Sequence, residues 1–134
     1  MDVRIKRIYE APDPADGTRV LVDRLWPRGL AKADAALDLW LKQAAPSAEL
    51  RKAWHADAHG RDREHFEAFA GDYRRELAEE PASAAVDRLV ELAREPRRLT
   101  LLYGARDERV NHAVVLRDAV LERAERAPRG EPAG

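Results

Sequence analysis

The run Leu99–Tyr103 (LTLLY) constrains the fold more than any other segment of this sequence. Successive side chains of a β-strand point to opposite faces of the sheet, so a strand this apolar has to be covered on both faces. Strands of this kind occur in α/β proteins, where helices pack on the sheet. Pro96 and Gly104 bound the run, as expected for a short strand. We therefore expect Leu99–Tyr103 to be a strand inside a covered sheet.

Three further segments have the pattern of strands. Val3–Tyr9 alternates imperfectly, which is typical of a strand with one partly exposed face. Arg19–Arg24 (RVLVDR) has a β-branched centre and ends abruptly in charge. Leu37–Lys42 alternates strictly between apolar and polar residues, which favours a strand over a short helix continuing from Ala33.

The spacing of apolar residues predicts four helices. In the second of them, Phe66, Phe69, Tyr73 and Leu77 fall on one stripe. Proline cannot continue a helix, so Pro81 and Pro96 are expected to end the second and third. The predicted helices are Pro46–His55 with Ser47 as its N-cap, Arg61–Glu80, Ser83–Glu95 and Asn111–Arg126.

Strands that alternate with helices predict a single-domain α/β fold, in which a mostly parallel sheet of about four strands is covered by helices. We expect this domain to occupy residues 1–126 and residues 127–134 (APRGEPAG) to form a disordered C-terminal tail. One link departs from the pattern. The connection from Glu10 to Thr18 is too short for a crossover helix, so the first two strands are either antiparallel or linked in an unusual way.

The composition excludes several classes of function. The 134 residues contain no cysteine, which removes disulfide frameworks, thiolate nucleophiles and cysteine-ligated metals, and suits a cytoplasmic location. No stretch approaches the about 18 apolar residues of a spanning helix, so we expect no membrane association. With 24 Lys and Arg against 25 Asp and Glu, the net charge of −1 argues against non-specific nucleic-acid binding. The sequence predicts no particular oligomeric state.

We expect no cofactor and no metal. The sequence has no G-x-G-x-x-G run, no P-loop and no serine in a nucleophile elbow. His55, His59 and His65 are the candidate metal ligands, but they lie in a charge-rich stretch without a clear carboxylate geometry.

Two predicted strands, Arg19–Arg24 and Leu99–Tyr103, become polar where they end. Ligands of open α/β sheets bind outside the carboxyl ends of the strands. If these two strands are parallel neighbours, as we expect, their polar ends converge on one cleft. The candidate site residues are Asp23, Arg24, Arg28, Tyr103, Asp107, Asn111 and His112.

These residue types suit the binding of an anion and the transfer of a proton. Asp23 and His112 are the candidate catalytic acid and base, with His112 as the titrating group. Arg24 and Arg28 are candidate anion clamps, because a guanidinium group can make two parallel hydrogen bonds to a phosphate or carboxylate. The other predicted ligand-binding residues are Tyr103, Asp107 and Asn111, whose amide could orient a ligand.

Each candidate also has a structural interpretation. Asp107 fits the N-cap of the last helix. Asp23 and Arg24 could form ion pairs with other charges. His112 lies in the first turn of a helix, and Tyr103 could simply pack in the core. The expected closeness of these residues, not any single one of them, favours a site.

Four runs, VDRLWPRGLAK, LDLWLKQAAPSAELRKAW, FAGDYRREL and LTLLYGARDERVNHAVVL, resemble the YeaO-like family of small bacterial proteins (domain of unknown function 488). The resemblance spans about Val3 to Leu121. It implies three groups of signature residues, but it does not imply a particular reaction. Where the family tends to show a His-Asp pair, this chain has Ala56-Asp57. The implied signature residues are Asp23, Arg24, Trp26, Pro27, Arg28 and Gly29; Trp40, Lys42, Pro46, Ser47 and Arg51; and Tyr103, Asp107, Asn111 and His112.

Two functions from different classes fit the sequence. The first is an enzyme or sensor that holds a small anionic, phosphate- or carboxylate-bearing ligand at the strand ends. The second is a non-enzymatic regulatory or interaction module, for which nucleic acid is one candidate partner. A concave pocket enclosing Asp23 and His112 would favour the first, and a convex basic face with Trp26 exposed would favour the second. The residues of such a basic face are Arg19, Arg24, Arg28 and Lys32.

Overall fold

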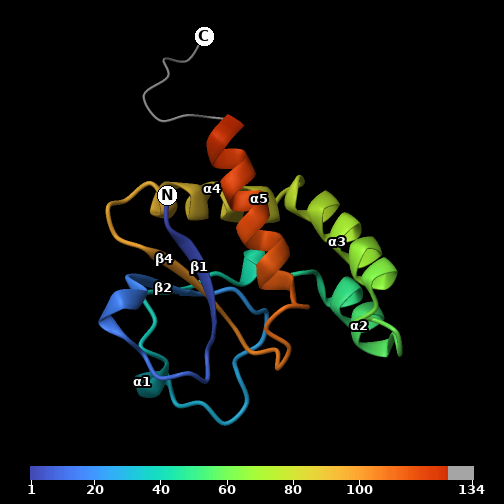
Figure 1. Ribbon diagram of the computed structural model, residues 1–134, viewed down its shortest axis with the longest axis horizontal. Coiled ribbons are helices and arrows are strands. Elements are labelled where there is room, and N and C mark those ends of the chain that lie inside the picture. The colour runs from blue at the N-terminus through green and yellow to red at the C-terminus, as the bar shows by residue number, and fades with distance from the viewer. Residues whose placement is uncertain (127–134) are drawn as a thin grey trace.

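A four-stranded sheet forms the centre of the computed structural model, which describes residues 1–126; the predicted tail lies outside the described residues (Figure 1). The strands lie in the order β1-β4-β2-β3, and every neighbouring pair is parallel. The single-domain α/β fold with a parallel sheet of four strands is therefore confirmed. The strands are β1 (Val3–Arg7), β2 (Thr18–Leu21), β3 (Leu39–Trp40) and β4 (Leu99–Tyr103).

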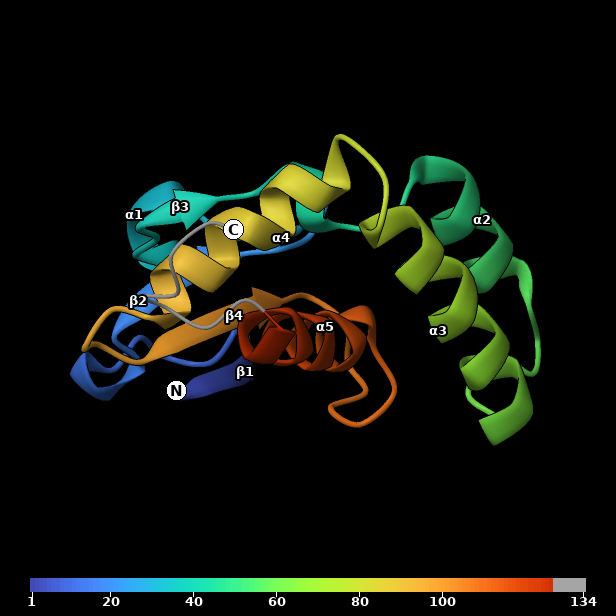
Figure 2. The ribbon, with the colours of Figure 1, turned by 90° about the horizontal axis from the view of Figure 1, so that it is seen from above.

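The helices divide into three groups around the sheet. Figure 2 shows α4 and α5 on one face, the short α1 on the other, and α2 with α3 beside the α4–α5 layer. All four predicted helices are present, with ends that differ by three residues or fewer. No helix among residues 1–126 is long and apolar enough to cross a membrane. The helices are α1 (Lys32–Ala35), α2 (Ala48–Ala56), α3 (Arg63–Leu77), α4 (Ala82–Ala93) and α5 (His112–Arg126).

The short link between β1 and β2 is the unusual connection that the sequence left open. Its antiparallel alternative is wrong, because both strands pair in parallel with β4, which lies between them. The link contains only a single turn of 3-10 helix at Pro14–Asp16 and ends at Gly17. Gly17 has a φ of +67°, and a Cβ there would lie 2.1 Å from the carbonyl oxygen of Arg98. The close approach of these two backbones is therefore possible only with glycine.

The central strand β4 is buried on both faces, as its apolar sequence predicts. Leu101 and Tyr103 pack into the main core with α3, α4 and α5. Leu102 points to the other face and packs with Ile8 and Leu21. Since no described residue of β4 is more than 2% exposed, this strand holds the two sides of the molecule together.

A polar network lies on the second face of the sheet, beside the apolar cluster that contains Leu21 and Leu102. The Arg19 side chain donates from Nη1 to Asp16 Oδ2 at 2.5 Å, and from Nη2 and Nε to the carbonyl oxygens of Ala35 (2.8 Å) and Ala36 (3.0 Å). Lys6 Nζ lies 3.0 Å from both Asp16 oxygens. Burial alone would raise the pKa of Asp16, but the hydrogen bonds from the backbone of Asp13 and from Lys6 and Arg19 lower it overall. The network thus keeps a charged carboxylate beneath the sheet.

Candidate functional site

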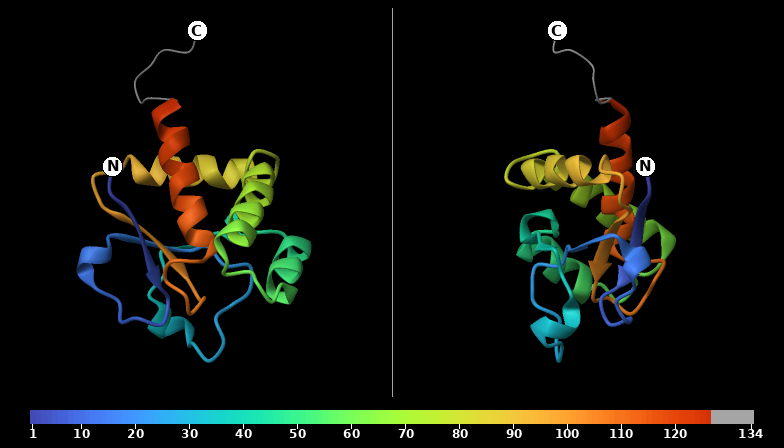
Figure 3. Two further views of the ribbon diagram at one scale, coloured as in Figure 1. Left: turned by 45° about the vertical axis from the view of Figure 1, so that its right-hand side comes forward. Right: turned by 90° about the vertical axis from the view of Figure 1, so that its left-hand side faces the viewer.

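A cavity of about 440 Å³ lies at the carboxyl ends of β2 and β4. These strands are parallel neighbours, as predicted, and Figure 3 shows α5 starting beside their ends. The cavity therefore collects side chains from the loops after both strands, from α2 and from the start of α5. Its lining residues include Tyr9, Asp23, Arg24, Leu25, Trp26, Pro27, Arg28, Arg51, Trp54, His55, Phe69, Val110, Asn111 and His112.

Asp23 ties the ends of the two strands together. Its Oδ2 accepts a hydrogen bond from the backbone N–H of Gly104 at 2.8 Å, and its own carbonyl oxygen accepts one from Trp40 Nε1 at 2.7 Å. A Cβ on Gly104 would lie 2.9 Å from Asp23 Oδ2. Residue 104 therefore has to be glycine if the carboxylate is to approach the backbone this closely.

His112, the first residue of α5, lies against Asp23 on the floor of the cavity. Its Nε2 is 3.0 Å from the carbonyl oxygen of Val22 and 3.1 Å from Asp23 Oδ1. Both neighbours are oxygen acceptors, so the tautomer that fits them carries its hydrogen on Nε2. The bond to Val22 has the better geometry, because the buried Oδ1 of Asp23 has no hydrogen-bond partner. One carboxylate oxygen thus lies beside the imidazole without a bond of its own.

Three arginines line the cavity without a carboxylate partner. Arg24 donates from Nε to the carbonyl oxygen of Pro46 at 3.0 Å, which anchors the loop after β2 to the start of α2. Arg28 is exposed, and its carbonyl oxygen accepts a hydrogen bond from the Tyr9 hydroxyl at 2.9 Å. Arg51 comes from α2. Within residues 1–126, no carboxylate oxygen lies within 4.0 Å of any of these three guanidinium groups.

The predicted site residues Tyr103 and Asp107 do not line the cavity. Tyr103 is 2% exposed and packs in the core, where burial raises the pKa of its hydroxyl. Asp107 Oδ1 accepts hydrogen bonds from the backbone N–H groups of Arg109 (2.9 Å) and Val110 (3.0 Å), which lower the pKa of that carboxyl. Tyr103 is therefore a core residue, and Asp107 shapes the loop that leads into α5.

Asn111 lines the cavity, and its amide is used to start α5. Its Oδ1 accepts a hydrogen bond from the backbone N–H of Val114 at 3.1 Å, and its Nδ2 donates to the carbonyl oxygen of Asp107 at 2.9 Å. The N-cap of α5 is therefore Asn111, and the prediction of Asp107 in that role is wrong by four residues. Asp107 instead caps the bend before the helix, because the N–H groups that it binds belong to Arg109 and Val110, which precede the start of α5 at His112.

The sequence interpretation missed the wall that α2 contributes. Arg51, Trp54 and His55 all line the cavity and are spaced three and four residues apart. This spacing puts them on one face of the helix. Trp54 packs on Phe69 of α3, with ring centroids 4.4 Å apart. The i, i+3, i+4 spacing was visible in the sequence, but the direction of this face depends on how α2 packs.

A row of aromatic rings leads from this wall to His112. Phe69 is followed by Tyr73 at a centroid distance of 5.8 Å, and Tyr73 meets the His112 ring edge-on at 6.2 Å. The buried Tyr73 hydroxyl donates to the carbonyl oxygen of Ala44. Burial, followed by the negative charges of Asp23 and Glu76, raises the pKa of Tyr73 well above its usual value. Tyr73 therefore supports His112 as a neutral packing partner.

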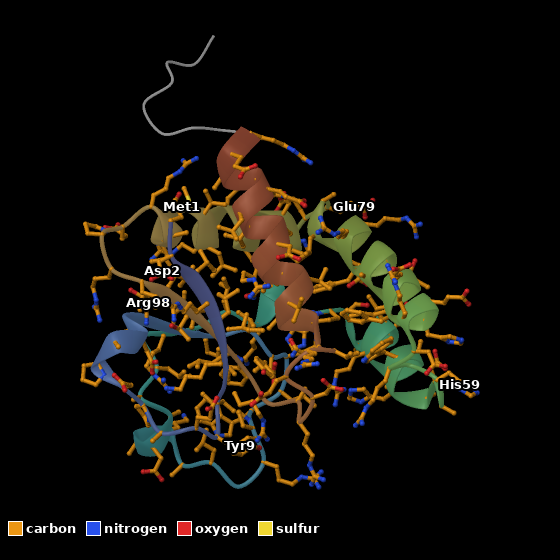
Figure 4. The ribbon with its side chains drawn as sticks, viewed as in Figure 1. Met1, Asp2, Tyr9, His59, Glu79 and Arg98 are labelled. Carbon is orange, nitrogen blue, oxygen red and sulfur yellow. The ribbon has the colours of Figure 1, made fainter. Side chains whose placement is uncertain are left out.

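The other three histidines, His55, His59 and His65, lie in different surroundings. His55 lines the cavity, whereas His59 lies at the outer end of the α2–α3 pair, far from Tyr9 at the strand-end edge (Figure 4). His65 Nδ1 is 2.7 Å from Asp57 Oδ2, and this hydrogen bond raises the pKa of His65. Across the described part of the chain, no group of three or more His, Cys, Asp and Glu side chains is placed to hold a metal ion.

Comparison with known proteins identifies the family. The chain is 43% identical to the uncharacterised protein YeaO of Escherichia coli over 118 residues, which are 88% of this chain and 96% of YeaO. It is 45% identical over 87 residues to the uncharacterised proteins Rv3073c of Mycobacterium tuberculosis and Mb3100c of Mycobacterium bovis, covering 65% of this chain and 70% of each relative. No solved structure matches the chain. Residues 2–133 match the family described as the inactive DUF488-N3 subclade, and the chain therefore belongs to this family of YeaO-like DUF488 proteins.

Proposed function

We propose that this protein binds a small anionic ligand, carrying a phosphate or carboxylate group, in the cavity at the carboxyl ends of β2 and β4. The observation that carries the proposal is the set of three cavity arginines, Arg24, Arg28 and Arg51, with no described carboxylate within 4.0 Å of their guanidinium groups. Arginine remains charged at any physiological pH and presents a planar fork of donors that matches phosphate and carboxylate oxygens. An anion would therefore complete the charge balance of this cavity.

The rest of the cavity supports the same ligand. The N-terminus of α5, a helix of 15 residues, begins at His112, and the positive end of its dipole favours a nearby anion. Asp23 ties the strand ends together through the N–H of Gly104, and His112 holds the first turn of α5 against the carbonyl oxygen of Val22. In this proposal Arg28 and Arg51 clamp the ligand, and Arg24 also fixes the loop between them.

We propose binding rather than turnover. The matched subclade is described as inactive, which supports a protein that holds its ligand without transforming it. The predicted acid–base pair fits this role, because His112 Nε2 donates to the backbone of Val22 and is thereby engaged in holding α5 against β2. Asp23 and His112 then act as positioning residues for the floor of the site.

The alternative, a module that contacts nucleic acid, has less support. Arg19 is 4% exposed and bonds within the second face of the sheet, so it is not available to a phosphate backbone. Trp26 packs edge-on against Trp40 at 5.3 Å and donates its N–H to the carbonyl oxygen of Leu30. A tryptophan held in this way makes a poor stacking platform for a base.

Calorimetric titration tests the proposal with inorganic phosphate, pyrophosphate, phenyl phosphate, benzoate and citrate at low ionic strength. We expect at least one of these anions to bind and Arg28→Ala to weaken that binding by tenfold or more, because a charge-assisted contact is lost. Folding should be unchanged, since Arg28 is exposed. Arg75→Ala, which removes an exposed arginine of α3 paired with Asp72, is the matched control and should bind normally. Equal affinity of Arg28→Ala and the native protein, or no binding of any of the five anions, would refute the proposal.

A further inference from the structure

The charge of the cavity distinguishes between classes of anion. Its charged lining residues are three arginines and Asp23, which leave a formal charge of +2 when both histidines are neutral. A single carboxylate neutralises only half of this charge. A phosphate monoester carries about −1.5 to −2 at neutral pH and matches it. The charge balance therefore favours a phosphate monoester over a monocarboxylate.

The size of the cavity implies that the phosphate is attached to a larger body. A volume of about 440 Å³ lies in the range of pockets that bind whole organic ligands, which is roughly 300–1,000 Å³. The lining residues away from the arginines include Leu25, Pro27, Trp54, Phe69 and Val110. An inorganic ion would leave these apolar side chains facing water. The part of the ligand beyond the phosphate is therefore expected to be apolar or aromatic.

The wall formed by α2 adds a preference for a flat ring. Trp54 is only partly buried and lines the cavity, with Phe69 packed against it at 4.4 Å. Aromatic side chains of this kind bind the flat faces of rings, and stacking of a nucleobase is worth about 1–3 kcal/mol. Arg51 lies one helical turn before Trp54 on the same face, so a cation and an indole stand about 5–6 Å apart at their Cβ atoms. A ligand that carries both a phosphate and a ring can contact both side chains.

We infer that the ligand is an organic phosphate with a flat aromatic ring, of the size of a nucleoside monophosphate. Its phosphate lies among Arg24, Arg28 and Arg51, and its ring lies against Trp54. This inference rests on the proposed function and names the ligand class of the same site.

Titration of the full chain with four probes tests the inference: adenosine 5′-monophosphate, ribose 5-phosphate, adenosine and inorganic phosphate. Calorimetry gives the affinities, and tryptophan fluorescence reports on the cavity because Trp26 and Trp54 line it. We expect adenosine 5′-monophosphate to bind at least tenfold more tightly than ribose 5-phosphate and than adenosine. Trp54→Leu should remove the advantage over ribose 5-phosphate, and Trp54→Phe, which keeps a ring, should retain most of it. Circular dichroism checks that both variants are folded.

The outcomes separate this inference from the proposed function. If ribose 5-phosphate and adenosine 5′-monophosphate bind equally tightly and both depend on Arg28, the anion site stands and the aromatic ligand class is wrong. If the advantage of the ring survives in Trp54→Leu, the assignment of the ring to Trp54 is overturned. If none of the three phosphates binds but a carboxylate such as citrate does, the anion site stands and the phosphate ligand class is wrong. If no anion binds at all, the proposed function is overturned and the inference falls with it.

Discussion

Replacing Arg19 by methionine is the most informative test of how the second face of the sheet is held. The side chain of Arg19 is 5% exposed and connects the turn before β2 to the end of α1. It bonds the Asp16 carboxylate and the carbonyl oxygens of Ala35 and Ala36. Methionine has a similar length and packs well in a core, but it can make none of these bonds.

The expected cost follows from the groups left behind. Removing one partner of a buried ion pair typically costs about 3–5 kcal/mol, because the other charge and its acceptors stay buried without compensation. Lys6 remains within 3.0 Å of Asp16 and limits the loss at the carboxylate. The two alanine carbonyl oxygens lose the bonds that Arg19 provides. We therefore expect Arg19→Met to lower the free energy of unfolding by about 3–4 kcal/mol at pH 7.

Equilibrium unfolding in urea, followed by circular dichroism, measures this loss. With a slope of about 2 kcal/mol per molar urea, the midpoint should fall by roughly 1.5–2 M. For a chain of 134 residues with an unfolding entropy of about 2.1 cal/mol/K per residue, the melting temperature should fall by about 10–14 °C. Arg75→Met is the control, because Arg75 pairs with Asp72 on the exposed surface of α3. It should change the free energy by less than about 0.5 kcal/mol.

The pH dependence of this loss gives a sharper criterion. The pKa of Asp16 is lowered in the folded protein, so its contribution is fully present above the pKa of an unfolded aspartate, and it is lost as the pH falls through the lower folded value. Without Arg19, the pKa of Asp16 is lowered less, because burial still raises it and only the hydrogen bonds from Asp13 and Lys6 remain to lower it. The difference between Arg19→Met and the native protein should therefore be largest near neutral pH and smaller near pH 3. A difference below 1 kcal/mol, or one that is the same at both pH values, would refute this account of the network.

Two further variants test local contacts. Gly104→Ala places a Cβ 2.9 Å from Asp23 Oδ2 and should lower the free energy of unfolding in urea by about 1–3 kcal/mol. Gly71→Ala in α3 is the control: a Cβ there meets nothing within 4 Å, so it should raise this free energy by up to about 1 kcal/mol. Equal effects of the two substitutions would show that the contact at Gly104 does not limit stability. Asp57→Asn replaces the carboxylate that raises the pKa of His65 by a neutral acceptor, so the imidazole should titrate at lower pH by NMR. An unchanged titration would mean that the pair does not persist in solution.

The sheet could be predicted because its central strand carries a local signal. The apolar run of β4 requires burial on both faces, and the predicted helices on either side of it indicate a mostly parallel, covered sheet, whereas the direction of β1 relative to β2 was left open. The cover of the second face could not be predicted in the same way. It depends on Lys6, Asp16 and Arg19, which come from three separate segments, and a charged residue in a strand pattern ordinarily indicates an exposed position.

The candidate site was predictable in part for a similar reason. Asp23 and His112 both follow apolar strands, so the parallel pairing of β2 and β4 is enough to bring them together. The α2 wall was not predictable, because α2 has no buried residue and its orientation is set by contacts with α3. The exchange between Asp107 and Asn111 has a simpler cause. Both residue types cap helices well, and only the backbone path decides which one does so.

The position of β4 has a consequence for the order in which the fold can assemble. β4 is the last strand in the chain, yet it lies between β1 and β2, which have no direct pairing with each other. During synthesis, β1 therefore stays unpaired with β4, its only described partner strand, until Leu99–Tyr103 has left the ribosome. At translation rates of roughly 5–20 residues per second, this delay amounts to several seconds. The contacts that close the sheet also span almost the full domain, which predicts a slow two-state folding reaction for a protein of this size. The strand order also predicts how fragments of the chain behave: a fragment that ends before Leu99 lacks the centre of its sheet, and we expect a second fragment that carries β4 and α5 to restore it.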